Sequence, residues 1–271
     1  RYKSDDTLDP ILCRDVADCE LIQVISGLKN KKAQGCDQVT WEHIRHAGKP
    51  IQDHLKNLYN LFLTKAYIPI EVKRGLIISL YKGNNKPKSK CESYRGIALL
   101  NTTYKLFEKI MLHRIYEWKT NHNIVIPNPL QAATQPKLCS LTTSFTLQET
   151  VNHYVERGSN VYCCFIDVQK AYDTVWKEGL FYKLYDKGIK GKAWNLLLQS
   201  YTEAESQVLY FGKLSRPFCM ERGVRQGGVL STFLYNIFID ELLQILTTTK
   251  CGTSINSLYT GNPAQADDLA L

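Results

Sequence analysis

The stretch FIDVQKAYD, residues 165–173, decides the expected fold of this 271-residue chain. It overlaps the β-prone run NVYCCFIDV, residues 160–168, whose nearly continuous apolar character is typical of a strand covered on both faces. Asp167 lies near the end of this run, and a buried carboxylate is costly unless it is paired or binds a cation. The sequence therefore predicts a buried strand that ends in a functional carboxylate.

Around this strand, helical and β-prone segments mix without a regular β-α-β alternation. This mixture favours an α+β fold over a doubly wound parallel sheet. The periodicity predicts helices over 51–66, 102–120, 140–157, 178–188, 191–202 and 229–247, strands over 75–81, 160–168, 206–211, 216–220, 254–259 and the last residues, a basic loop over 83–93 and irregular chain over 123–139.

The net charge of +8 comes entirely from the first half of the chain. Residues 1–130 hold 21 Lys and Arg against 13 Asp and Glu, whereas residues 131–271 hold 13 of each kind. Nine basic residues fall between Lys73 and Lys109. Such a block suits contact with a phosphate backbone, although charge alone fits a solvated surface equally well.

The nine cysteines form no Cys-x-x-Cys pair and lack the spacing of a zinc site. They are interpreted as core thiols in a reducing compartment, with Cys163 and Cys164 on opposite faces of a strand. The opening RYKSDD has no apolar core of a secretory signal, and no run reaches the roughly 18 apolar residues of a membrane helix. The chain is expected to be intracellular, neither secreted nor transmembrane.

Two further segments belong with FIDVQKAYD. GVRQGGVLS, residues 223–231, is a glycine-rich turn before a long helix, and its exposed N–H groups and Arg225 would suit a phosphate or nucleotide. ADD, residues 266–268, places two carboxylates side by side, which repel each other unless a divalent cation lies nearby. Alone, each is more often a solvated turn, a packing glycine or a helix cap. Together, three carboxylates on two strands with a glycine-rich turn between them are what two-metal phosphoryl transfer requires.

These segments, in this order, resemble motifs A, B and C of reverse transcriptases, above all those of non-LTR (LINE-type) retrotransposons. LKNKKAQGCD is similar to the N-terminal extension of that family, and GLIISLYKG with YRGIALLNTTYKLFEKIMLHRI resembles its finger motifs. The resemblance covers about residues 28–271. It implies a right-hand polymerase with fingers and palm and no thumb, divided into an N-terminal helical extension (1–75), fingers (76–158) and an incomplete palm (159–271).

The resemblance also implies the site. Asp167, Asp267 and Asp268 would be the catalytic, metal-binding triad, with two Mg²⁺ ions as cofactors and Mn²⁺ as an alternative. Asp173 is interpreted as structural. The partners would be an RNA template, a DNA primer and dNTPs; no membrane is implied, and nothing in the sequence indicates a protein partner.

Five residues would bind the nucleotide. Lys82 and Arg95 match basic finger residues that neutralise the triphosphate, and both lie in the basic block. Tyr172 matches the aromatic residue that stacks under the incoming sugar and excludes a 2′-OH. Gln226 and Gly227 match the segment that lines the pocket for the nucleotide and the template base.

Three features depart from the family pattern. Gln265 stands where Tyr or Phe normally precedes the Asp pair and helps to support the primer end. Ala133, Thr134 and Gln135 replace a Gly-Phe-Arg run, which puts a template contact in doubt. Nothing follows Leu271, so the rest of the palm and the thumb are expected to be missing. The endonuclease expected upstream is missing too, and the chain is interpreted as an internal piece of a longer protein.

The leading hypothesis is RNA-directed DNA synthesis by two-metal nucleotidyl transfer from dNTPs to a primer 3′-OH. The alternative is a catalytically inactive nucleic-acid-binding remnant of such an element, which Gln265 and the missing thumb favour. An RNA-dependent RNA polymerase would share the palm chemistry, but a bulky Tyr172 would clash with a ribose. The family implies access to both nucleus and cytoplasm.

Overall fold

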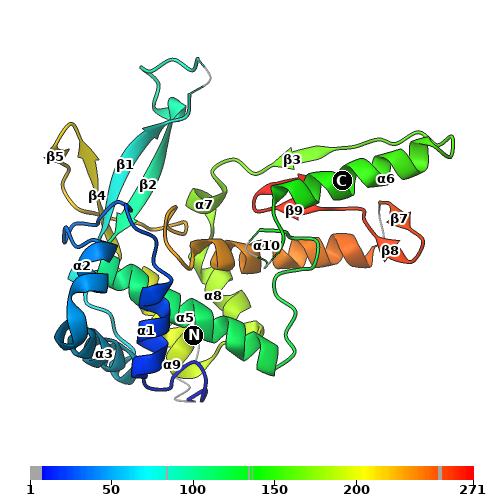
Figure 1. The fold of residues 1–271 in the computed structure, drawn as a ribbon. Helices are drawn as coiled ribbons and strands as arrows, with labels where there is room; N and C mark the ends of the chain where they lie inside the picture. Colours follow the sequence, from blue (N-terminus) through cyan, green and yellow to red (C-terminus); the bar gives the residue numbers. More distant parts are fainter. Residues whose placement is uncertain (1–7, 84, 134, 136, 250–251) are drawn as a thin grey trace.

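The structure is a computed structural model that describes residues 8–83, 85–133, 135, 137–249 and 252–271. A helical body carries two sheets and a separate two-stranded hairpin, and one long helix, α10, crosses the middle of the molecule (Figure 1). One hydrophobic cluster joins buried residues from Leu12 to Ile237. Helices and strands mix as predicted, and the named strands pair antiparallel except for one pair, which agrees with the α+β class.

The N-terminal helices pack around a long buried helix. α3 buries an apolar stripe that includes Leu55, Tyr59 and Phe62, at the three- and four-residue spacing that places side chains on one helix face. Arg114, fully buried on the long helix, donates to both carboxylate oxygens of Glu20 at 2.7 Å and so ties the N-terminal segment to it. The N-terminal helices are α1 (Asp18–Ser26), α2 (Trp41–His46) and α3 (Gly48–Lys65), and the long buried helix is α5 (Thr102–Asn121). The single turn α4 (Ile70–Lys73) lies between α3 and α5 in the chain.

The first sheet projects from this body as a long hairpin (Figure 1). β1 (Gly75–Tyr81) and β2 (Tyr94–Leu100) pair over their full length, and the basic loop with a 3₁₀ turn at Cys91–Ser93 connects them. The other edge of β1 pairs in parallel with β4 (Glu205–Tyr210), which comes from much later in the chain. Two short strands, β5 (Lys213–Leu214) and β6 (Phe218–Cys219), pair with β4 and replace the simple hairpin predicted there.

Five more helices follow along the chain, and four of them, α6, α8, α9 and α10, confirm the predicted helical segments. α8 and α9 lie below α10 in Figure 1, and α6 lies beside the second sheet. A short helix, α7, follows the strand that carries Asp167. Their bounds are α6 (Ser140–Val155), α7 (Ala171–Thr174), α8 (Lys177–Asp186), α9 (Gly191–Tyr201) and α10 (Ser231–Thr248).

The second sheet contains the segments that the sequence links to function. Its strand order is β3-β10-β9, all antiparallel. Leu269 and Ala264 pack against Leu243 of α10, so one face of the sheet rests on that helix. The strands are β3 (Phe165–Asp167), β9 (Ala264–Gln265) and β10 (Asp268–Ala270), and a separate hairpin pairs β7 (Ser254–Ile255) with β8 (Leu258–Tyr259).

The prediction of a long buried strand over 160–168 is wrong. Only β3 is a strand, its three residues are exposed, and Phe165 keeps 72% of its surface accessible. β3 is an edge strand in the described part of the chain, with β10 as its one neighbour. Backbone pairing reaches back only to Cys164, which exchanges two hydrogen bonds of 2.8 Å with Leu271. An apolar β-prone run therefore predicted the strand but not its coverage.

The cysteines also differ from the prediction of core thiols. Among the residues that the structure describes, eight cysteines are free; Cys13 is half-buried and the others are exposed. Cys163 and Cys164 precede β3 rather than lying within it, and Cys251 lies outside the described residues. Of the helices that the structure describes, none combines the length and apolar character required to cross a membrane.

Candidate active site

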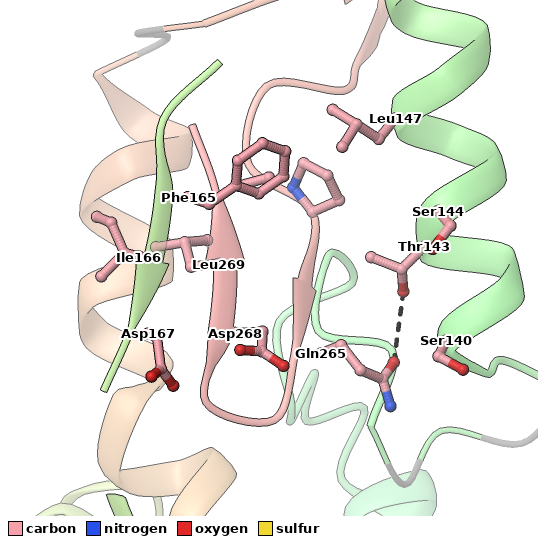
Figure 2. Close-up of a pocket in the computed structure, with 12 residues that line it drawn as sticks. Ser140, Thr143, Ser144, Leu147, Phe165, Ile166, Asp167, Gln265, Asp268 and Leu269 are labelled. Atoms are coloured by element: carbon pink, nitrogen blue, oxygen red, sulfur yellow. Dashed lines mark hydrogen bonds between the residues drawn. The ribbon is translucent and has the colours of Figure 1, made fainter. Parts of the chain in front are cut away.

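Backbone pairing brings the three predicted aspartates to one end of the second sheet. Asp268 on β10 lies directly opposite Asp167 on β3, and such cross-strand partners have Cα atoms about 4.5–5.5 Å apart. Asp267 precedes Asp268 in the two-residue turn between β9 and β10. Figure 2 shows the Asp167 and Asp268 carboxylates at the same end of neighbouring strands. The sequence separation of about a hundred residues is thus closed by one β-pair.

Like charge accumulates at this end of the sheet. The pKa of Asp268 is raised above its usual range by partial burial first, and then by the negative charges of Asp267 and Asp167. Like charges directly opposite on a β-ladder are destabilising. A bound cation would remove this repulsion, and carboxylate oxygens are the ligands that Mg²⁺ prefers. Within the described ranges, however, no three His, Cys, Asp or Glu side chains have the spacing of a complete metal-ligand set.

A buried glutamine that sequence reasoning missed holds the turn before the Asp pair. Gln131 is fully buried; its Oε1 accepts the Ala266 N–H at 2.7 Å and the Ala133 N–H at 3.1 Å, and its Nε2 donates to the Ala266 carbonyl at 3.0 Å. Ala266 adopts a φ of 56°, in the left-handed region that non-glycine residues rarely occupy. The side chain of Gln131 therefore fixes a strained turn that carries Asp267.

Tyr172, on the short helix α7, lies close to the aspartates. Its ring stacks on that of Tyr235, with centroids 5.2 Å apart and planes 19° apart. Its hydroxyl donates to Thr232 Oγ1 at 3.2 Å. Burial is the main reason that the pKa of Tyr172 is raised, and the charge of Asp267 adds to the shift, whereas the Thr232 bond opposes it. The phenol is thus neutral, half-buried and near the carboxylates.

The glycine-rich segment connects α7 to the first sheet. The Gly223 N–H donates to the Val175 carbonyl at 2.8 Å and the Val224 N–H donates to the Tyr172 carbonyl at 2.7 Å. Three residues later, the Gln226 carbonyl accepts the Ala98 N–H of β2 at 2.7 Å. The segment therefore couples the turn that carries Tyr172 to the hairpin that carries Arg95.

Comparison with known proteins shows the family to which this chain belongs. Residues 85–265 match the family described as reverse transcriptase (RNA-dependent DNA polymerase), which is more than half of the chain. The chain belongs to the reverse transcriptase family. The match includes Asp167, Tyr172 and Gln226 and ends just before Asp267 and Asp268.

Curated relatives confirm the resemblance to the reverse transcriptases of non-LTR retrotransposons. The chain is 29% identical over 227 residues to a probable RNA-directed DNA polymerase from transposon BS of Drosophila melanogaster, covering 82% of the chain and 24% of that protein. It is 29% identical to the RNA-directed DNA polymerase from mobile element jockey of Drosophila funebris, covering 86% and 25%. It is 27% identical to the Pol polyprotein from type-1 retrotransposable element R2 of Popillia japonica, covering 95% and 35%. The chain thus spans about a quarter to a third of the length of these relatives.

In this reverse transcriptase chain, Arg225 is not the phosphate ligand that the sequence suggested. Its side chain is buried, donates to the Ser200 carbonyl at 2.8 Å and lies over the rings of Tyr104 and Tyr201, 5.4 and 5.2 Å from their centroids. The N–H of Val229, two residues before α10, is also occupied, because it donates to Glu108 Oε2 at 2.9 Å. Contacts with Glu108 and Ser200 therefore hold the glycine-rich turn in place, and Arg225 packs in the core between two aromatic rings.

The predicted finger cations lie on the hairpin of the first sheet. Lys82 follows β1, and its Nζ donates to the Glu92 carbonyl at 2.8 Å. Arg95 on β2 is exposed and lies opposite Leu80. Within the described residues, neither cation forms an ion pair with an aspartate. The two cations belong to the hairpin of the first sheet and the aspartates to the second sheet, and the glycine-rich segment contacts that hairpin through the bond between Ala98 and Gln226.

A cleft of about 300 Å³ separates α6 from the second sheet (Figure 2). Most of its lining is apolar, with Phe165 and Leu269 on the sheet side and Leu147 on α6. Asp167, Asp268 and Gln265 also line it.

Gln265, the residue that departs from the family aromatic, contacts α6 at this cleft. Its Oε1 accepts a 3.4 Å hydrogen bond from Thr143 of that helix. Of the residues that replace the Gly-Phe-Arg run of the family, Ala133 is buried and Gln135 donates to the carbonyls of Asn128 and Gln131. Thr134 lies outside the described residues.

Proposed function

We propose that the paired ends of β3 and β10 form the nucleotidyl-transfer centre of an RNA-directed DNA polymerase. The observation that carries this proposal is the register in which Asp268 opposes Asp167 next to Asp267. In the reaction, the primer 3′-oxygen forms a bond to the α-phosphorus of a dNTP, the bond to pyrophosphate breaks, and the 3′-OH loses its proton. Positioning and charge stabilisation are what the protein must supply for such a transfer.

Carboxylate oxygens are donors that divalent cations prefer, although within the described residues these three side chains do not have the spacing of a complete ligand set. Mg²⁺ in nucleotide-processing sites is usually held by one or two carboxylates, with waters and substrate phosphates completing the shell. Asp167, Asp267 and Asp268 would hold two such ions, with Mn²⁺ as an alternative. When bound, the metal makes the 3′-OH more acidic and offsets charge on the transferred phosphoryl group. The chain's own part is to hold the carboxylates together against their repulsion, through the β-pair and the Gln131 bonds.

The nucleotide would lie between the two sheets. Tyr172, beside Asp267, is proposed to stack under the sugar and to exclude a 2′-OH. Lys82 and Arg95 on the projecting hairpin are proposed to neutralise the triphosphate. Gln226 and Gly227 would line the base pocket, where Gly227 approaches the β2 backbone so closely that an added Cβ would lie 2.6 Å from the Ala98 carbonyl oxygen.

This assignment divides the chain as the resemblance implies. Residues 1–75 would be an N-terminal extension, residues 76–158 the fingers and residues 159–271 the palm of a right-hand polymerase. The partners would be an RNA template, a DNA primer and dNTPs, bound partly through the exposed basic loop. We also propose that the protein works inside the cell with access to DNA in the nucleus.

Primer extension tests the proposal. The purified chain would be given a DNA primer on an RNA template with Mg²⁺, first with dNTPs and then with rNTPs. The proposal expects extension with dNTPs and little with rNTPs. Efficient extension with rNTPs would indicate an RNA polymerase instead. Binding of the primer–template without extension in either nucleotide set would indicate a nucleic-acid-binding remnant and would overturn the proposal.

A matched pair of variants separates the roles of the basic residues. Arg95→Gln should raise KM for dNTP more than it weakens template binding, because the side chain is assigned to the triphosphate. Lys86→Gln, on the exposed basic loop, should weaken template binding and leave KM for dNTP close to the parent value. Equal losses in both parameters for Arg95→Gln would assign that residue to general backbone contact.

A further inference from the structure

Two residues of α10 hold the ring of Tyr172 from different directions. Tyr235, which is 2% exposed, stacks against the ring face at a centroid distance of 5.2 Å. Thr232 accepts the hydrogen bond from the Tyr172 hydroxyl at 3.2 Å. The two residues are three positions apart on one helix and so lie on the same helix face. One rigid element thereby contacts both the face and the tip of the ring.

The supporting helix is itself fixed in the core. Phe233, Leu234 and Ile237, the neighbours of Tyr235 on α10, are all buried. Tyr172, by contrast, is only half-buried, and its helix α7 has four residues. A helix of one turn offers few contacts to its own side chains, whereas α10 contacts both the face and the hydroxyl of the Tyr172 ring. The position of the Tyr172 ring therefore depends on α10.

The stacked ring also lies close to the carboxylates. Burial is the main reason that the pKa of Tyr235 is raised, and the charge of Asp267 is the next contribution, ahead of Tyr172 and Asp268. Tyr235 is thus a neutral, buried side chain that stacks on Tyr172 close to the carboxylates.

We propose that Tyr235 and Thr232 are positioning residues that set the selectivity of this chain for deoxyribonucleotides, by holding the Tyr172 ring where a 2′-hydroxyl would have to lie. The proposal rests on the function proposed above and goes beyond it. A ring that excludes one hydroxyl must be fixed to within less than an atomic diameter. Without the stack or the bond it would populate other rotamers, and the excluded space would open for part of the time.

The test compares incorporation of one dNTP and its rNTP counterpart on an RNA template. Tyr235→Leu removes the stack but retains apolar volume, and should lower the ratio of kcat/KM for dNTP over rNTP about tenfold. Thr232→Val removes the hydrogen bond at constant shape, and should lower the ratio about threefold. Phe238→Leu is the matched control, because it shortens another aromatic side chain of α10, whose ring faces the Lys183 ammonium at 5.4 Å, and it should leave the ratio unchanged.

A double variant tests whether both residues act through Tyr172. Tyr172→Ala removes the ring, so adding Tyr235→Leu to it should change selectivity no further. Proportional loss of kcat/KM for both nucleotides in Tyr235→Leu, with an unchanged ratio, would overturn the proposal. So would an additive effect in the double variant.

A binding measurement keeps this result separate from the proposed function. Thermal shifts with Mg²⁺ and either dNTP or rNTP require no turnover, and the difference between the two nucleotides should shrink in Tyr235→Leu. If the parent chain extends no primer, the proposed function fails. If the parent distinguishes the nucleotides and Tyr235→Leu does so equally well, the positioning role fails. Circular dichroism verifies that each variant is folded.

Discussion

Replacing Gln131 by leucine should loosen the turn that carries the Asp pair. The substitution retains the side-chain volume but removes an acceptor for two N–H groups and a donor to one carbonyl. Ala133 is buried, so the loss of the hydrogen bond from its N–H to Gln131 should cost about 1–3 kcal/mol. The two groups of Ala266 are only half-buried, and each should cost about 0.5–1 kcal/mol. The expected destabilisation is therefore about 3 kcal/mol.

The control is Gln135→Leu on the same segment. Gln135 donates to the carbonyls of Asn128 and Gln131 and, among the residues that the structure describes, to no group of the turn. Its loss should cost about 1 kcal/mol, because carbonyl groups tolerate the loss of one of two bonds better than N–H groups do. Urea unfolding at 25 °C, followed by circular dichroism, gives both values. A rescue follows from the same geometry: Ala266→Gly in the Gln131→Leu background should recover part of the loss, since glycine adopts a positive φ without strain.

Two results would refute this reasoning. If Gln131→Leu unfolds within about 0.5 kcal/mol of the parent, a size typical of neutral surface changes, the three bonds do not stabilise the turn. If Gln135→Leu is as costly as Gln131→Leu, the effect belongs to the whole segment and not to the contact with Ala266.

Four further variants test three other parts of the structure by urea unfolding. Gly227→Ala should cost about 3 kcal/mol, because its φ of 112° combines with a backbone clash, whereas Gly212→Ala, with a φ of 74° and open space around it, should cost about 1 kcal/mol; equal costs would exclude the clash. Burial raises the pKa of Glu108 above its ordinary 4.5, so the folded chain retains this proton more strongly than the unfolded chain. The free energy of unfolding should therefore fall as pH rises above about 4.5, and Glu108→Gln should flatten this fall. An unchanged slope in Glu108→Gln would contradict the assignment of the pH dependence to Glu108. Arg114→Leu leaves Glu20 without its bidentate partner and should cost about 3–5 kcal/mol; a loss below about 1 kcal/mol would mean that the N-terminal segment is held by apolar packing alone.

Elements with strong local periodicity could be predicted from the sequence. The helices α3, α5 and α10 and the strand β1 carry apolar residues at helical or strand spacing, and the structure has them within a few residues of the expected ranges. Elements defined by pairing could not. The strand β2 contains Arg95 and Gly96, which weaken a strand pattern, and it forms because β1 supplies a partner along its full length.

Burial was the least predictable property, because it depends on packing between distant segments. Phe165 and its neighbours are apolar, yet they lie on an edge strand and remain exposed. Arg225 is a residue type that is rarely buried, yet it is enclosed by Tyr104 and Tyr201, which come from two other helices. Neither outcome has a local signal in the sequence.

The candidate site divides in the same way. The order of the three motifs predicted that Asp167 and the Asp pair would meet, since residues on adjacent strands can do so, and the β3–β10 register brings them opposite each other. Gln131 gave no signal, because a lone glutamine in an irregular segment resembles any surface residue. Tyr235 falls on the apolar face of α10 and would be read as core from periodicity alone, so its contact with Tyr172 required the structure.

The most direct test of the central claim compares Asp167→Asn with Asp173→Asn in primer extension on an RNA template. Both residues are exposed aspartates of the same segment, but only Asp167 lies opposite Asp268. Asp167→Asn should abolish synthesis and leave the unfolding free energy equal or higher by about 0.2–1 kcal/mol, because a cross-strand repulsion is removed. It should also lose the stabilisation that Mg²⁺ gives to the parent. Asp173→Asn should retain synthesis and the response to Mg²⁺. Extension by Asp167→Asn at the parent rate would contradict the assignment of the catalytic centre to the paired ends of β3 and β10.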